Sequence, residues 1–118
     1  GAAKTSTIAS SLSESVGADH SANVGGNQST NVSGGATLQA GKDIGLSAGQ
    51  ALSGSAGKEI TLNAGTKVTI VAADEMTFKV GSATIVLKKS GDIAVSGNKI
   101  SIKASADLVM KGSKIAQN

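Results

Sequence analysis

Few residues of this chain have side chains that could do chemistry, and His20 is the first to consider because it is the only histidine. If three copies of the chain met around a common axis, three imidazoles would lie together and could bind a metal or an anion. The alternatives are a polar interior layer that holds water, with Gln28 and Thr30 in further layers, or a shifted register that leaves His20 outside. We predict no metal and no cofactor, and keep His20 as the one axial candidate.

The only adjacent pair of acids is Asp74-Glu75. Paired carboxylates can serve as general acid and base, but Asp74 falls at an outward corner of the pattern described below, so a solvated corner is the prediction. The short basic pair Lys88-Lys89 is also predicted to be a solvated corner. Serine is abundant, yet a single histidine offers no general base for a serine nucleophile. We therefore predict no catalytic residues and no enzymatic activity.

The composition limits the classes of protein that fit. The chain has 118 residues with 16 Gly, no Pro, no Cys, no Trp, no Tyr and a single Phe. The absence of cysteine excludes a disulfide framework. The net charge is +3, and all 11 basic residues are lysines spread along the chain. Nucleic-acid binding uses arginines or stacking aromatic rings beside such charges. The start at Gly1, without Met, leads us to expect a fragment of a longer protein.

The strongest pattern is an internal repeat of eight residues that begins at Val16. Good examples are the blocks AGKDIGLS, AGKEITLN and AGTKVTIV. Each block opens with a small residue or Val, usually followed by Gly, then polar residues, then an apolar–polar–apolar triplet. Alternation with period 2 is typical of a strand with one buried face. The Gly is expected to form a corner where φ can be positive.

The triplets place pairs of apolar residues on the predicted inward face. These pairs form the predicted core of the assembly, which consists of Ile44, Leu46, Ile60, Leu62, Val68, Ile70, Met76, Phe78, Ile85, Leu87, Ile93, Val95, Ile100, Ile102, Leu108 and Met110.

Two steps between successive pairs differ from eight residues. The step from Met76/Phe78 to Ile85/Leu87 is nine, and the step from Ile93/Val95 to Ile100/Ile102 is seven, so the two slips cancel. We expect a bulge or a distorted corner near residues 80–83, with residues 88–92 and 96–99 taking up the compensation. Thr84/Val86 is the competing inward pair in this stretch.

The first blocks have a more polar predicted interior. In the same register they carry His20/Ala22, Gln28/Thr30 and Ala36/Leu38, while their strongest apolar residues are the openers Val16, Val24 and Val32. Residues 1–15 follow the period only loosely, through Ile8. We therefore divide the chain into a loosely repetitive lead-in, residues 1–15, and an octad-repeat β-helix, residues 16–118.

Eight residues are too few for one chain to complete a closed turn, which leaves two architectures. A single chain could use two or three blocks per turn and form a solenoid. Alternatively, three chains could wind about one axis, each block crossing one face of a triangular prism between strands of the other two chains. Large aliphatic residues are thinly spread, so a single chain can bury too little apolar surface to offset the cost of ordering it. We therefore predict an all-β, intertwined homotrimeric triple-stranded β-helix that rises about 4.8 Å per block.

The blocks VGADHSAN–VGGNQSTN, followed by AGKDIGLSAGQALSGSAGKEITLNAG, resemble the C-terminal needle of the VgrG spike proteins of type VI secretion. They are also similar to the valine-glycine octads of the spike of contractile-tailed phages. The resemblance covers residues 16–118 and implies a homotrimeric β-prism mounted on a secretion tube and driven through a target membrane. It further implies assembly in the bacterial cytoplasm, delivery to the target cell envelope, and a PAAR-repeat tip protein or an effector at the C-terminal end.

The leading functional hypothesis is therefore mechanical. The chain would be a membrane-puncturing needle that transmits axial force, with two further copies of itself and the tip protein as partners, and transient contact with the target membrane. Nucleic acid is not an expected partner. The second hypothesis is a binding module, a trimeric or solenoid stalk of the adhesin type on a cell or phage surface. A monomeric mass in solution would favour a solenoid and exclude the trimer.

Overall fold

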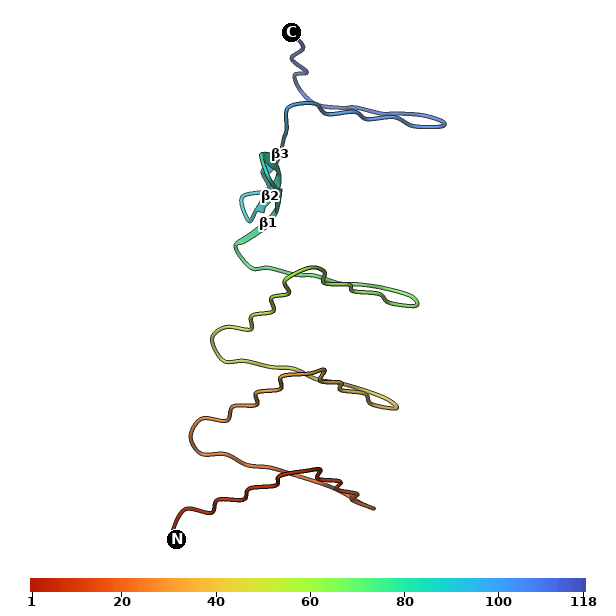
Figure 1. Cartoon of the computed structure of the whole chain (residues 1–118). Helices are drawn as coiled ribbons and strands as arrows, with labels where there is room; N and C mark the ends of the chain where they lie inside the picture. Colours follow the sequence, from red (N-terminus) through yellow and green to blue (C-terminus); the bar gives the residue numbers. More distant parts are fainter. The chain divides into compact units, whose positions relative to one another are not determined.

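The computed structural model describes residues 1–118 and is all-β, which confirms the predicted fold class at that level. Three strands, β1 (Glu75–Val80), β2 (Ala83–Lys88) and β3 (Ile93–Ser96), form one antiparallel sheet in the order β1-β2-β3 (Figure 1). The chain divides into two units, Gly1–Ser53 and Gly54–Asn118, which are described separately. No helix in it is long and apolar enough to cross a membrane.

The first unit consists of extended segments joined by bends at a regular spacing (Figure 1). The bends recur every eight residues, at Ala9-Ser10, Gly17-Ala18, Gly25-Gly26, Ser33-Gly34, Gly41-Lys42 and Gly49-Gln50. We call these positions, and their equivalents in the second unit, the octad corners. The period read from the residue types is therefore also a period of the backbone, and it includes a corner within the lead-in residues 1–15.

The second unit keeps the same spacing of corners along its whole length. Bends or turns lie at Gly57-Lys58, Gly65-Thr66, Ala73-Asp74, Gly81-Ser82, Lys89-Ser90, Asn98, Ser105-Ala106 and Ser113. Asn98 alone departs from the eight-residue frame, and it does so by one residue. The slips found between apolar pairs therefore displace only this corner, which lies in residues 96–99, where a compensating change was predicted.

The bulge or distorted corner expected near residues 80–83 is not a bulge, and the corner found there is one at which the chain reverses direction. Gly81-Ser82 forms the turn of a β-hairpin between β1 and β2, and residues 89–92 connect β2 to the antiparallel strand β3. In an antiparallel pair, equivalent residues are mirrored about the turn, so they do not recur at a fixed step. Met76 thus faces Leu87 and Phe78 faces Ile85, which explains why the pairs step by nine. The step of seven lies after β3, where the chain returns to the octad frame.

The glycines of the octad corners outside the sheet do not have the positive φ angle that the sequence led us to expect. Positive φ occurs only at Gly81 (φ 55°) and Gly91 (φ 93°), and both lie in the connections between antiparallel strands. The expectation of positive φ is therefore wrong for the glycines of the octad corners outside the sheet, and it is confirmed for Gly81.

A single chain has no buried core. No side chain in it is buried, and its accessible surface is 12572 Å², whereas a compact monomer of this mass would expose about 5,800 Å² and the unfolded chain about 16,500 Å². The backbone hydrogen bonds within the chain are confined to the sheet and the residues next to it. The apolar residues that would form a core are present, but one copy does not cover them.

Candidate functional site

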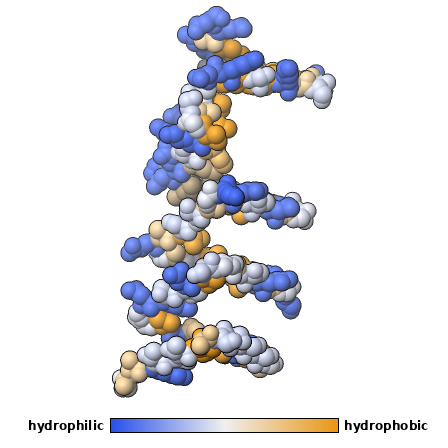
Figure 2. Space-filling view, in the orientation of Figure 1, coloured by the Kyte–Doolittle hydropathy of each residue, from blue (hydrophilic) through white to orange (hydrophobic).

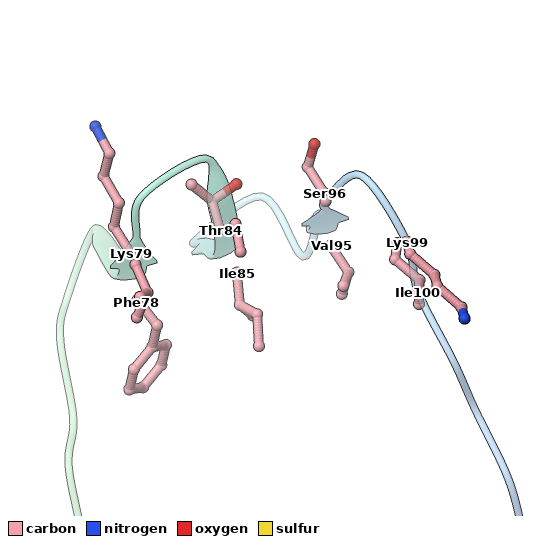
Figure 3. Close-up of a pocket in the computed structure, with 11 residues that line it drawn as sticks. Phe78, Lys79, Thr84, Ile85, Val95, Ser96, Lys99 and Ile100 are labelled. Atoms are coloured by element: carbon pink, nitrogen blue, oxygen red, sulfur yellow. The ribbon is translucent and has the colours of Figure 1, made fainter.

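The three-stranded sheet has one entirely apolar face. Residues directly opposite each other in a ladder share a face, and the registers of the two ladders place the following residues together: Met76, Phe78, Val80, Ala83, Ile85, Leu87, Ile93 and Val95. We call this set the apolar face. The close-up shows Phe78, Ile85 and Val95 pointing to the same side of the sheet (Figure 3).

The apolar face remains open to solvent even at its centre. Ile85 and Leu87 lie on the middle strand, yet they are 42% and 37% exposed, and Phe78 on the edge strand is 51% exposed. Over β1–β3, apolar residues gather on one side and polar residues on the other (Figure 2). A continuous, uncharged apolar surface of this kind typically marks an interface with another macromolecule.

The opposite face of the sheet is mostly polar. Glu75 lies across from Lys88 and Lys79 lies across from Thr84, and Lys79, Thr84 and Ser96 point away from the apolar face (Figure 3). Opposite charges at facing positions of a ladder are mildly stabilising. Thr84 and Val86, the competing inward pair of the sequence analysis, lie on this polar face, and both are half-buried.

The turn between β1 and β2 contains two residues, Gly81 and Ser82, and Val80 pairs with Ala83 beside it. Glycine at the first central position with positive φ is the arrangement of a type II′ hairpin turn, whose twist matches that of the two strands. This turn holds β1 and β2 in the register that brings Phe78 opposite Ile85.

The connection from β2 to β3 is held by its own hydrogen bonds. The Gly91 N–H donates to the Lys88 carbonyl (2.9 Å), and the Lys88 N–H donates to the Asp92 carbonyl (3.1 Å). The Lys89 N–H donates to the Asp74 carbonyl (3.0 Å), and the Lys89 ammonium lies 3.4 Å from the Asp74 carboxylate. Both side chains of this ion pair are largely exposed, so it contributes little to stability.

A shallow hollow lies beside the apolar face at the end of the sheet nearest the first turn. Its lining includes Phe78, Ile85 and Val95 from the sheet, and Lys99 and Ile100 from the segment that follows β3 (Figure 3). Ile100 begins the apolar pair Ile100/Ile102, with which the octad register resumes. The apolar surface of the sheet therefore continues into the repeat.

In six of the octads, the size of the opening residue changes inversely with that of the residues at the pair positions, whereas Ala48 opens an octad whose pair positions hold Leu52 and Gly54. The openers are Val16, Val24 and Val32 where the pair positions hold His20/Ala22, Gln28/Thr30 and Ala36/Leu38, and they become Ala40, Ala56 and Ala64 where the pairs are Ile44/Leu46, Ile60/Leu62 and Val68/Ile70. Close-packed interiors conserve volume in this way. The three early valines are equally half-exposed, at 46%, 47% and 47%. In these six octads, the sizes of opener and pair are therefore matched to each other.

The candidate chemical residues do not come together into one site in the single chain. His20 is exposed, and no group of three or more His, Asp or Glu side chains lies close enough to hold a metal ion. Asp74 pairs with Lys89, and Glu75 faces Lys88 across the ladder, so each of the two acids lies beside a lysine and not beside a second acid or the histidine. The prediction that these residues form solvated corners is confirmed for Asp74 and Lys89.

Sequence reasoning missed the chain reversals that build the apolar face. The signal was present, because a Gly-Ser dipeptide between two runs of alternating apolar residues is typical of a β-hairpin, and Gly81-Ser82 stands in that position. Comparison with models of known protein families finds no match for this chain, and comparison with curated proteins finds none either.

Proposed function

We propose that this chain is one of three intertwined copies in a rigid β-helical needle that transmits axial force, as the needle of a type VI secretion spike does. The observation that carries the proposal is the exposure of nearly every large aliphatic side chain in a single copy, at positions that recur with the period of the backbone corners. Three copies wound about one axis would turn these residues inward at every level. The accessible area lost in this way is the burial that one chain lacks.

The glycines at the octad corners provide independent support. Gly49, Gly57 and Gly65 have no positive φ, and a Cβ added to any of them would meet nothing within 4 Å in the same chain. Neither backbone strain nor crowding within one copy therefore requires glycine there. Close approach of a neighbouring backbone is the remaining physical reason for repeated small residues at these positions.

A needle of this kind works as a shaft and has no reaction centre. Each strand would pair with strands of the other two copies, so the rod has no exposed sheet edge along its sides. An axial load is then shared by many backbone hydrogen bonds, each of which is weak by itself. Under this proposal the C-terminal blocks, residues 104–118, are the platform that receives a PAAR-repeat tip protein or an effector.

The experiment for the role of the needle is a binding assay with the PAAR-repeat protein of the same secretion system. We expect one tip protein to bind per three chains, and removal of residues 104–118 to abolish that binding. Removal of residues 1–15 is the matched control and should leave binding intact. A chain that forms trimers but binds no tip protein, or binds it without residues 104–118, contradicts the assigned platform and favours a stalk-type binding module.

A further inference from the structure

A three-chain rod made of near-identical octads has a problem of alignment. The blocks AGKDIGLS, AGKEITLN and AGTKVTIV place small corner residues and apolar pairs at the same positions. One chain could therefore slide by eight residues against its partners and still bring corner to corner and apolar pair to apolar pair. Register is weakly specified wherever a shifted pairing buries the same kinds of side chain, so some other feature must align the three copies.

The antiparallel sheet, residues 75–96, is the feature that breaks the repeat. Only here does the chain reverse direction, at Gly81-Ser82 and again at residues 89–92, and only here do apolar pairs step by nine and then by seven. If one copy slid by an octad, its apolar face would meet extended octad segments of its partners. Phe78 and Ile85 would then lack the matching surface that an aligned sheet provides.

The sheet is also the part of the chain that can form before the copies meet. Its ladder joins residues that are near neighbours in the sequence, with Glu75↔Lys88 as the widest pair between β1 and β2. Closing such short loops costs little entropy and is fast. The octad segments have no backbone ladder within one chain, so they gain their hydrogen bonds only from partner chains.

We propose that the sheet of residues 75–96 is a registration surface, on which three copies first associate through their apolar faces and which fixes the alignment of the whole rod. This inference rests on the proposed three-chain assembly and deepens it. In the assembly, the apolar face of each copy packs against the apolar faces of the other two copies. Because the apolar face bears no charge, identical copies approach one another without like-charge repulsion.

The edges of the sheet also favour association with other copies of the chain. β1 and β3 are the outer strands, so each has one row of backbone groups without a partner in its own copy. The β3 edge of one copy can pair with the β1 edge of the next, and three such head-to-tail contacts close into a ring. Octad segments that start from this aligned point then pair outward in both directions.

The test uses a longer chain that keeps the sheet intact. In this long chain, residues 41–64, which are three octads, are duplicated directly after Ala64. The parent chain carries Ile44→Cys. Two versions of the long chain are made, one with this change in the first copy of the duplicated segment and one with it in the second copy. The chain contains no other cysteine. The first copy keeps its distance from the N-terminus, whereas the second copy keeps its distance from the sheet.

The long chain is refolded with parent chain in large excess, oxidised, and analysed for covalent adducts between the two lengths. A displacement of three octads is roughly 14 Å, at about 4.8 Å per octad, and exceeds the reach of a disulfide bond. We expect adducts through the second copy to exceed those through the first by at least about tenfold. Adducts through the first copy, or no adducts between the two lengths, overturn the registration surface. A monomeric parent chain instead overturns the proposed needle, and this is measured first.

Discussion

Phe78 lies directly opposite Ile85 across the β1–β2 ladder, and both project from the same face of the sheet. In one copy each of them remains about half exposed. This pair connects the pattern of the sequence to the proposed function, because the alternation that suggested a strand produces here an exposed apolar face, which the proposed trimer would cover.

Ile85→Lys tests whether the apolar face is an interface. Three lysines would enter one uncharged layer of the assembled trimer, and an unpaired buried charge costs several kcal/mol. We expect loss of the trimer, or a free energy of unfolding lower by at least about 3 kcal/mol. Thr84→Glu is the matched control, because Thr84 is the neighbouring residue on the polar face and lies across from Lys79, which an acidic side chain does not repel. Solution mass and thermal melting are the measurements, and equal behaviour of the two variants would mean that the apolar face is not covered.

Ile60→Lys tests the inward face of the octads in the same way. Ile60 begins a predicted inward pair and is 63% exposed in one copy. Thr61→Lys changes the next residue, which alternation places outward and whose hydroxyl donates only an exposed hydrogen bond to Glu59. We expect Ile60→Lys to lower the melting temperature severely and Thr61→Lys to leave it nearly unchanged. If Ile60→Lys melts like the parent protein, the inward assignment is wrong.

Gly57→Val tests whether partner chains approach closely at the octad corners. The single chain has room for a side chain at Gly57 and no positive φ there, so a monomer should tolerate the change. In the trimer we expect a loss of about 1–3 kcal/mol from overpacking. Gly57→Ala is the control, because Ala73 occupies the equivalent corner, and it should be nearly neutral. Denaturant unfolding measures both, and a neutral Gly57→Val shows that the corners face open solvent.

Gly81→Val tests the hairpin turn separately from the assembly. Gly81 has φ 55°, and a left-handed backbone costs a residue with a Cβ roughly 1–2 kcal/mol, and more if it is β-branched. Each trimer would contain three such turns, so we expect slower refolding and lower stability. Gly81→Asn should recover much of the loss, since asparagine tolerates this conformation better. Refolding rates that are the same for all three proteins would contradict the hairpin as an early structure.

The sequence predicted the all-β class and the eight-residue period because both are local properties. Alternation of Ile60 and Leu62 with polar residues indicates a strand, and Gly57 beside Lys58 indicates a corner. The reversal at Gly81-Ser82 was interpreted as a bulge because the repeat suggested that every block follows the same path. The step of nine residues is compatible with either geometry, and only the pairing of Met76 with Leu87 distinguishes them.

The sequence placed the apolar pairs on both sides of the turn on one inward face, but it did not reveal that Phe78 lies directly opposite Ile85 in an antiparallel pair. That relationship depends on antiparallel register, in which Phe78 and Ile85 are mirrored about the turn, and a period of eight residues carries no information about it. The role of His20 stays a prediction for a related reason. A single imidazole becomes a site only if other copies bring theirs to the same level, and one chain does not determine that.

The central claim is that three copies of the chain complete one another, and the solution mass tests it most directly. Light scattering at several concentrations should give three times 11.4 kDa, with no dissociation on dilution, because the interface includes nearly all the apolar surface of the chain. A mass of 11.4 kDa that does not change with concentration would contradict the intertwined trimer, and with it both the needle and its registration surface.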